Sequence, residues 1–333
     1  MKLIRIILFP IVPIYYLVTW LRNKLYDAEI KSSKSYNFPI ICVGNLSTGG
    51  TGKTPMVEYL IRLLKDEKRL ATLSRGYKRK TDGFILADEN ATTDSIGDEP
   101  FQFYNKFKNE ISVAVDSNRQ NGIVRLRSLD PKPEVVLLDD AFQHRKVKAG
   151  FNVLLTAYNN LYYNDIVLPT GNLREPQSGA KRADIVVVTK CRKDLSEVEK
   201  SKIISELKLR NTQKVFFSYI EYAETVMSEF DTLELATLPK FTLVTGIADA
   251  KPLVDFLAYK GLHFDHLEYN DHYNFKTSDI EFLATKPLVI TTEKDYVRLS
   301  NDGRLNDKLY FLPIQIAIDQ SEVFDAAVKS FID

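Results

Sequence analysis

The chain has 333 residues, of which 44% are hydrophobic and 11% aromatic, and 45 basic and 44 acidic side chains give a net charge of +1. The length predicts about two domains, and the apolar fraction excludes a disordered chain. A near-neutral chain without a basic run argues against a nucleic-acid coat. Cys42 and Cys191 are too few for a disulfide framework or an all-cysteine zinc site. We expect both to be small buried hydrophobic residues in a reducing compartment.

An uncharged apolar run, IILFPIVPIYYLVTWL, occupies residues 6–21 and is flanked by basic residues. It is shorter than the about 20 residues of a spanning helix, and Pro10 and Pro13 would disturb a helix placed there. A secretory signal fits the basic start but neither the prolines nor the missing cleavage pattern. We favour an amphiphilic segment in one bilayer leaflet, with its aromatic residues at the interface and its cations on anionic headgroups. The alternative is an ordinary helix packed on the body.

The remaining chain has the pattern of an α/β protein, because β-branched apolar runs alternate with helix-like stretches. Such alternation predicts parallel sheets with helices on both faces. A composition shift across residues 217–238 marks the expected domain junction. The predicted strands are 39–43, 111–115, 135–138, 153–155, 185–188, 241–244, 288–290 and 310–318, and the predicted helices include 56–68 and 196–209.

A glycine-rich segment, GNLSTGGTGKT, follows the first of these strands and opens a helix at Pro55. Its amide groups and the helix N-terminus are suited to phosphate oxygens. Lys53 would reach the β- and γ-phosphates, and the Thr54 hydroxyl would hold Mg²⁺. Ser47 stands where the usual motif has its first glycine, and the extra glycines supply the flexibility instead. The predicted nucleotide-binding residues are Thr48, Gly49, Gly50, Thr51, Gly52, Lys53 and Thr54.

A second magnesium element is predicted where the apolar run 135–138 ends in two carboxylates. Asp139 would hold Mg²⁺ or its water molecules, and Asp140 could assist. Alone, such an ending is common in buried strands. Together with the phosphate loop it indicates a P-loop nucleotidase or kinase, and it leaves the acceptor open.

Loops elsewhere carry candidates for the acceptor side. Asp98 and Glu99 precede a predicted helix, where acidic residues also simply favour the helix dipole. His272 lies in a polar loop that is otherwise a solvated turn. Phosphoryl transfer to a hydroxyl needs a base and an orienting partner, so Asp98 and His272 are a candidate pair if the fold joins them.

Arg75 and Arg174 are loop cations that could hold a substrate phosphate, or belong to solvated turns. His144, His263 and His266 are expected to be surface residues rather than zinc ligands.

These segments closely resemble the tetraacyldisaccharide 4′-kinases, the lipid A 4′-kinases of Gram-negative bacteria. The matching pieces keep the family's order and spacing over most of the chain. GGTGKT alone is shared by many nucleotidases, whereas GDEP, DDAFQH and LREP in this order are more specific. The pieces are GNLSTGGTGKTP (44–55), SRGYKR (74–79), GDEP (97–100), LLDDAFQHR (137–145), LPTGNLREP (168–176) and ITTEKDYVR (290–298).

The resemblance implies transfer of the γ-phosphoryl group of ATP, with Mg²⁺, to the 4′-hydroxyl of a lipid-linked disaccharide 1-phosphate. It implies a P-loop NTPase-like α/β/α domain (29–218), a smaller α/β/α domain with a β-linker (219–333), and a membrane-associated N-terminal helix (1–28). By motif, Lys53 and Thr54 serve ATP and Mg²⁺, and Asp139 and Asp140 are the paired acids near the metal. Asp98 matches the base and His272 its partner, Glu99 the metal contacts and Arg174 the substrate contacts.

We therefore expect a peripheral or monotopic enzyme on the cytoplasmic face of the inner membrane, acting on the lipid A disaccharide precursor. No feature indicates a nucleic acid or an obligate protein partner. The alternative is an NTPase of the GGxGKT type that serves metal insertion or membrane assembly. Many such proteins carry lysine where this chain has Thr48, which disfavours that alternative.

Overall fold

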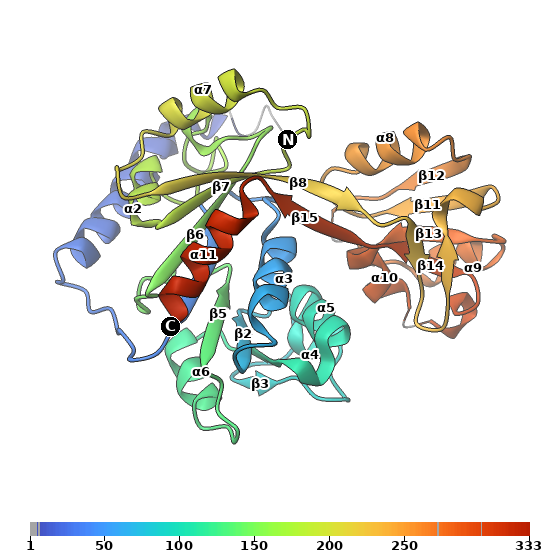
Figure 1. Cartoon of the computed structure of the whole chain (residues 1–333), viewed down its shortest axis with the longest axis horizontal. Helices are drawn as coiled ribbons and strands as arrows, with labels where there is room; N and C mark the ends of the chain where they lie inside the picture. Colours follow the sequence, from blue (N-terminus) through green and yellow to red (C-terminus); the bar gives the residue numbers. More distant parts are fainter. Residues whose placement is uncertain (1–4, 6, 272, 301) are drawn as a thin grey trace.

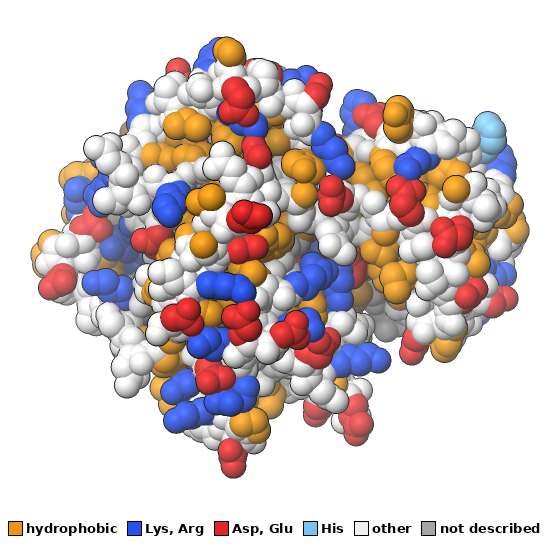
Figure 2. Space-filling view, viewed as in Figure 1, with side chains coloured by type: hydrophobic (Ala, Val, Ile, Leu, Met, Phe, Trp, Pro, Cys, Tyr) orange, Lys and Arg blue, Asp and Glu red, His pale blue; other side chains and the backbone are white. Residues whose placement is uncertain are grey.

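The computed structural model describes residue 5 and residues 7–271, 273–300 and 302–333. The chain forms a larger and a smaller lobe, which are joined by two strands that cross between them (Figure 1). Acidic and basic side chains intermingle over the face shown in Figure 2, as the near-neutral composition predicts.

The larger lobe is built on a nine-stranded sheet in the order β15-β8-β7-β6-β1-β5-β2-β4-β3. Neighbouring strands are parallel except at the two edges, where β3 and β15 run antiparallel. Every residue of β1, β2, β5 and β7 is buried, as the continuous apolar runs predict for strands covered on both faces. The strands are β1 (Ile40–Asn45), β2 (Leu70–Ser74), β3 (Ile85–Leu86), β4 (Ser112–Val115), β5 (Val135–Asp139), β6 (Phe151–Ala157), β7 (Ile185–Thr189), β8 (Lys214–Tyr222) and β15 (Ile314–Ile318).

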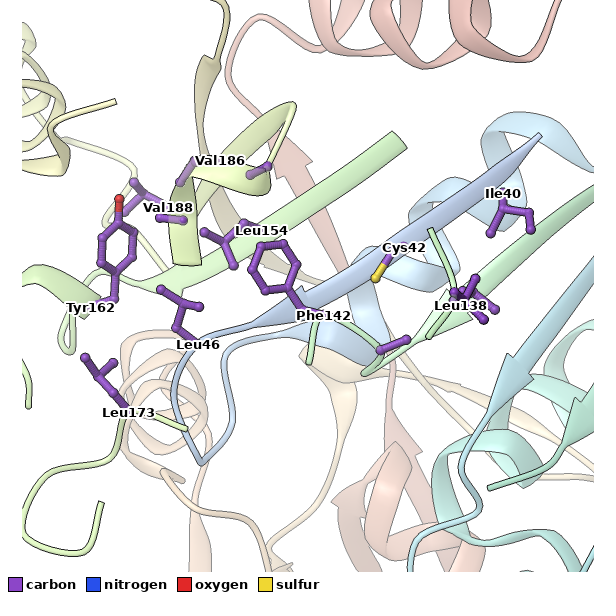
Figure 3. Close-up of a cluster of buried hydrophobic side chains, with 14 of the residues drawn as sticks. Ile40, Cys42, Leu46, Leu138, Phe142, Leu154, Tyr162, Leu173, Val186 and Val188 are labelled. Carbon is purple, nitrogen blue, oxygen red and sulfur yellow. The ribbon is translucent and has the colours of Figure 1, made fainter. Parts of the chain in front are cut away.

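Each face of this sheet has its own hydrophobic core, because successive side chains of a strand point to opposite faces. Ile41 and Val43 of β1 pack under α3, α5 and α11. Ile40 and Cys42 face the other core, under α6 and α7 (Figure 3). Both cysteines are buried and unbonded, which confirms that part of the prediction. The helices of this lobe are α3 (Lys53–Leu64), α4 (Thr93–Ile96), α5 (Asp98–Phe107), α6 (Arg119–Leu126), α7 (Glu197–Leu207) and α11 (Ser321–Ile332).

The smaller lobe contains a six-stranded sheet in the order β10-β9-β14-β13-β11-β12. Its central strands are parallel, and separate hydrophobic clusters cover its two faces. The predicted α/β fold with a second, smaller α/β domain is confirmed. The elements are β9 (Thr225–Met227), β10 (Thr232–Glu234), β11 (Phe241–Thr245), β12 (Phe264–Glu268), β13 (Val289–Thr292), β14 (Leu309–Leu312), α8 (Lys251–Tyr259), α9 (Thr277–Ala284) and α10 (Glu293–Leu299). Short 3₁₀ turns are η1 (Phe9–Ile11), η2 (Lys108–Glu110), η3 (Tyr162–Asn164), η4 (Gln177–Arg182), η5 (Leu235–Thr237) and η6 (Gly303–Leu305).

The single strand predicted over 310–318 is divided between the two lobes at Pro313. β14 ends at Leu312 in the small sheet, and β15 returns antiparallel to β8. Proline has no N–H for a ladder, so a strand that contains it tends to break there. After β15, α11 packs on the large sheet with Phe324 fully buried. Residues 314–333 therefore join the larger lobe, although the sequence division placed everything after 218 in the second domain.

Helix α2 (Val12–Asp27) lies on the side of the larger lobe away from the smaller lobe (Figure 1). Pro13 occupies its first turn, where proline is tolerated, so it does not disturb the helix. The helix presents polar groups inward: the Tyr15 hydroxyl donates to the Arg174 carbonyl at 3.0 Å. Its outward residues are apolar, with Leu17 59% and Val18 60% exposed. Within the described ranges, no helix has the length and hydrophobicity to cross a bilayer.

Candidate active site

A cavity of about 1080 Å³ lies between the two lobes. It opens at the carboxyl ends of β1, β5 and β7, the edge where parallel sheets bind their ligands. The smaller lobe contributes the loop after β11 and the start of α10, and the connecting strands β8 and β15 contribute apolar side chains. The described lining carries seven basic and seven acidic side chains, a balance that suits a nucleotide with its metal.

The glycine-rich segment forms a loop between β1 and α3, and all seven predicted nucleotide-binding residues line the cavity. Gly49 and Gly52 have φ values of 108° and 80°, which L-amino acids rarely adopt. The loop is braced at Thr51, whose hydroxyl accepts from Asn45 at 2.7 Å and whose carbonyl accepts from the Thr189 hydroxyl at 2.9 Å. A phosphate cradle needs such a fixed backbone with open space beside it, and nothing lies within 4 Å of a Cβ added at Gly49.

Asp139 and Asp140 end β5 beside this loop. Asp139 is only 7% exposed and accepts from the Ser74 hydroxyl at 3.1 Å. Burial and the neighbouring Asp140 carboxylate raise the pKa of Asp139 to about 6. Burial also acts on Asp140, but the opposing charges of Lys53 and Arg174 outweigh it and lower its pKa. The two adjacent carboxylates therefore titrate in different pH ranges.

Arg174 contacts the paired acids rather than a free region of the cavity. Its Nη1 atom donates to both Asp140 carboxylate oxygens, at 2.8 and 3.0 Å, while Lys53 Nζ lies 3.7 Å from the same carboxylate. The adjacent Glu175 is 1% exposed and accepts from Arg182 and from Asn23 of α2. The loop before η4 thus links the N-terminal helix to the phosphate site.

Asp98 and Glu99 begin α5, as predicted, but their side chains have different surroundings. Glu99 lines the cavity and lies 4.0 Å from Lys294 of the smaller lobe. Asp98 accepts a hydrogen bond from Nε of Arg298 in α10 at 3.0 Å. This ion pair and the bond between Lys106 and Glu293 at 2.7 Å connect the lobes at the α5–α10 contact.

His272 lies outside the described residues, so its predicted pairing with Asp98 stays a prediction. Its neighbour Asp271 lines the cavity, at 3.4 Å from Lys294. Arg75 also lines the cavity, is exposed, and makes no ion pair with any residue that the structure describes. His144 is half-buried beside the cavity rather than on the surface, and burial lowers its pKa to about 4.

Arg119 is a cavity residue that sequence reasoning missed. It is 2% exposed and donates to the backbone carbonyls of Asp116 and Asp139, so its guanidinium lies directly beneath the paired acids. At the start of an ordinary helix the sequence gives no signal for it. Arg298, by contrast, lies within the ITTEKDYVR segment that supported the family resemblance.

The residues predicted to hold magnesium offer oxygen atoms, the donor type that suits that ion. They are the Thr54 hydroxyl and the carboxylates of Asp139, Asp140 and Glu99, all on the cavity wall. Among the described residues, no three acidic, histidine or cysteine side chains converge on one point. Mg²⁺ commonly keeps water and phosphate oxygens in its shell, so this open donor set fits a metal that arrives with the nucleotide.

Comparisons with known proteins agree with this arrangement. A family model described as LpxK, tetraacyldisaccharide-1-P 4′-kinase, matches residues 4–333. The chain is 51% identical to the tetraacyldisaccharide 4′-kinase of Flavobacterium johnsoniae over 338 aligned residues, covering 100% of this chain and 98% of that relative. It is 43% identical to the protein of that name from Bacteroides thetaiotaomicron, covering 95% and 89%. The crystal structure of LpxK from Aquifex aeolicus in complex with ATP superposes with a TM-score of 0.78 at 29% identity, covering 99% of this chain and 100% of that one.

Proposed function

This chain belongs to the tetraacyldisaccharide 4′-kinase family, and from that premise we propose that it phosphorylates the 4′-hydroxyl of the tetraacyldisaccharide 1-phosphate precursor of lipid A with ATP. Membership of this family confirms the resemblance inferred from the motifs and replaces the GGxGKT assembly-NTPase alternative. The observation that carries the proposal is the direct connection between helix α2 and the phosphate site. Tyr15 of this outwardly apolar helix bonds the backbone of Arg174, whose side chain bonds Asp140 beside Lys53.

The phosphate loop binds the triphosphate of ATP through its backbone amides and the N-terminus of α3. Lys53 leaves its contact with Asp140 to reach the β- and γ-phosphates, which are the stronger anionic partners. The apolar strands β8 and β15 form the wall nearest the smaller lobe. The ATP complex of the Aquifex relative supports this placement.

Thr54 would contact Mg²⁺ through its hydroxyl, and Asp139, Asp140 and Glu99 would hold the ion or its water molecules. The metal neutralises charge on the transferring phosphoryl group. Arg174 holds the Asp140 carboxylate and the Ser74 hydroxyl holds that of Asp139, so these oxygens are oriented before the substrates arrive, while Arg119 holds the backbone carbonyl of Asp139. Once acceptor and nucleotide are present, Arg174 and Arg75 are also available to the acceptor's own phosphate.

Asp98 is the proposed base, with His272 as its partner. Its Oδ2 atom accepts from Arg298 of α10, so this ion pair occupies part of the carboxylate that would accept the proton. We therefore expect the pair to separate when the acceptor hydroxyl enters, which requires α10 to move relative to α5. Such a movement also excludes water, the competing acceptor for the phosphoryl group.

The outward apolar face of α2 supports a location on the membrane surface. A four-chain lipid does not diffuse freely in water, so an enzyme acting on its sugar headgroup works at the bilayer. Leu17 and Val18 would lie among the acyl chains, with Trp20 at the interface. This placement corresponds to a peripheral or monotopic protein on the cytoplasmic face of the inner membrane, where ATP is present.

The test is a transfer assay with γ-labelled ATP and the tetraacyldisaccharide 1-phosphate dispersed in detergent. We expect label on the lipid that phosphatase removes and that mild acid leaves in place, because mild acid cleaves the anomeric 1-phosphate but not a phosphate ester at the 4′-hydroxyl. Lys53→Ala protein is the matched control and should label the lipid at a rate on the order of 10²–10³-fold lower. Label that appears only as free phosphate would refute the proposal and favour an NTPase without this acceptor.

A further inference from the structure

A second cavity, of about 1070 Å³, lies in the larger lobe away from the phosphate loop. Its walls are the end of α2, the segment after it, η4, the segment after β5 (residues 141–147), and the chain at the starts of β6, β7 and β8. Strand starts lie at the sheet edge opposite to the nucleotide. Among the described lining residues, only His144 borders both cavities.

The charge of this cavity is unlike that of the nucleotide cavity. Its described lining has seven basic side chains against three acidic ones, an excess of four positive charges in a chain whose total is +1. One acid, Asp27, is paired with Arg145 at 2.8 Å. Another, Asp184, accepts from the backbone of Asn152 at 2.8 Å. The cavity therefore offers an anion site with few carboxylates that could hold a metal.

Most of these cations have no acidic partner among the residues that the structure describes. Arg182 is bound to Glu175 and Arg145 to Asp27. The other five make no ion pair with any residue in the described ranges: Lys24, Lys31, Lys148, Lys181 and Arg210. Positive charges held around one cavity repel one another. An anion that binds there is attracted by all of them.

The position of the cavity indicates where that anion comes from. Trp20 and Lys24 line it, and on α2 they lie about one and two turns beyond Leu17, which is on the outward apolar side of this helix. With that face among acyl chains, Trp20 lies at the level of the headgroups, where tryptophan is enriched. Lysine and arginine beside such a helix contact anionic headgroups.

We propose that this cavity binds the phosphate headgroup of an anionic membrane phospholipid in the same leaflet as α2. The proposal rests on the proposed membrane location of α2. The bound headgroup would fix the larger lobe against the bilayer at a point separate from the apolar face. The two contacts together define the height and tilt of the phosphate loop over the membrane.

Vesicle flotation tests the proposal with the full-length protein. The test variant combines Lys148→Gln, Lys181→Gln and Arg210→Gln, three lining residues outside the kinase machinery. The matched control combines Lys132→Gln, Lys202→Gln and Lys276→Gln, which are exposed and border neither cavity. Each protein is mixed with vesicles of phosphatidylcholine alone or with added phosphatidylglycerol.

We expect wild type and control to prefer the phosphatidylglycerol vesicles and the test variant to lose that preference. At about five-fold per cation near an anionic surface, the loss is on the order of 100-fold. Binding to phosphatidylcholine should be equal in all three, since the apolar face is unchanged. A test variant that keeps the wild-type preference, or a control that loses it equally, would overturn the proposal.

Inorganic phosphate, added at constant ionic strength, distinguishes the two sources of this anion. Failure to displace the wild type from the vesicles supports a lipid site, and displacement would show a site for free phosphate and overturn the proposal. Turnover with the detergent-dispersed acceptor should be the same for all three proteins. Because that assay needs no vesicle, it reports on the proposed kinase function independently, and it shows that the variants are folded.

Discussion

Replacing Asp139 by asparagine should stabilise the protein and abolish its activity. In the unfolded chain the carboxyl has its ordinary pKa of 3.8, and in the folded protein the pKa is about 6, with burial as the largest cause. Above pH 6 the folded state therefore holds an ionised group that it disfavours. A difference of about two pKa units costs about 3 kcal/mol, fully present at pH 8 and roughly halved at pH 5. Asparagine avoids this cost and still accepts from Ser74.

Urea denaturation of wild type and Asp139→Asn at pH 8 and pH 5 measures the effect. We expect the variant to be more stable at pH 8, with the advantage shrinking toward pH 5, and to have no kinase turnover at either pH. Wild-type turnover should itself fall as the pH drops below about 6. Asp140→Asn is the matched control, for which the expected change in stability has the opposite sign. Because the pKa of Asp140 is lowered in the folded protein, its negative charge stabilises the fold, and this variant should be less stable than wild type at pH 8. An Asp139→Asn protein that is less stable at pH 8 would refute the reasoning.

Further predictions concern the nucleotide, the base, the membrane and the lobes. Lys53→Ala should reduce kcat on the order of 10²–10³-fold and weaken ATP binding, measured by steady-state kinetics and by titration. Asp98→Ala should lower turnover by about 10²–10⁴-fold while ATP binding survives, and near-normal turnover would remove Asp98 from the role of base. Leu17→Glu with Val18→Glu should weaken vesicle binding on the order of 100-fold but spare turnover in detergent; equal losses in both assays would count against a membrane face. An ATP analogue with Mg²⁺ should narrow the cavity, and an unchanged distance between spin labels on the two lobes would contradict that closure.

The larger sheet was predictable because the apolar pattern that marks each strand lies within a few consecutive residues. Runs such as 135–138 and 185–188 are short, apolar throughout and rich in valine or isoleucine, which is typical of a strand buried on both faces. The phosphate loop was predictable for a related reason: glycine spacing, Lys53 and Thr54 all lie within a few residues of one turn. Chain order alone then placed the paired acids at the end of a neighbouring strand.

Strand β8 and the path of residues 310–318 were harder to predict. A proline marks the break within 310–318, but it does not say which sheet each half joins: β14 pairs with β13, about twenty residues away, and β15 pairs with β8, about a hundred residues away. The same holds for α11, whose apolar face fits either lobe by composition. The N-terminal helix was easier to predict. Its sequence already indicated an apolar surface segment, and the fold decided only which of its residues face inward.

The sequence by itself determined the α/β class, the triphosphate loop, the paired acids and the family, because each depends on residues close together in the chain. Only the tertiary structure decided which charges meet: Arg174 binds Asp140, Arg298 binds Asp98, Arg119 binds the Asp139 carbonyl, and five cations that pair with no acid in the described part of the chain surround one cavity. Contacts between distant segments depend on how the elements pack, and Coulomb interactions depend on separations in space rather than along the chain.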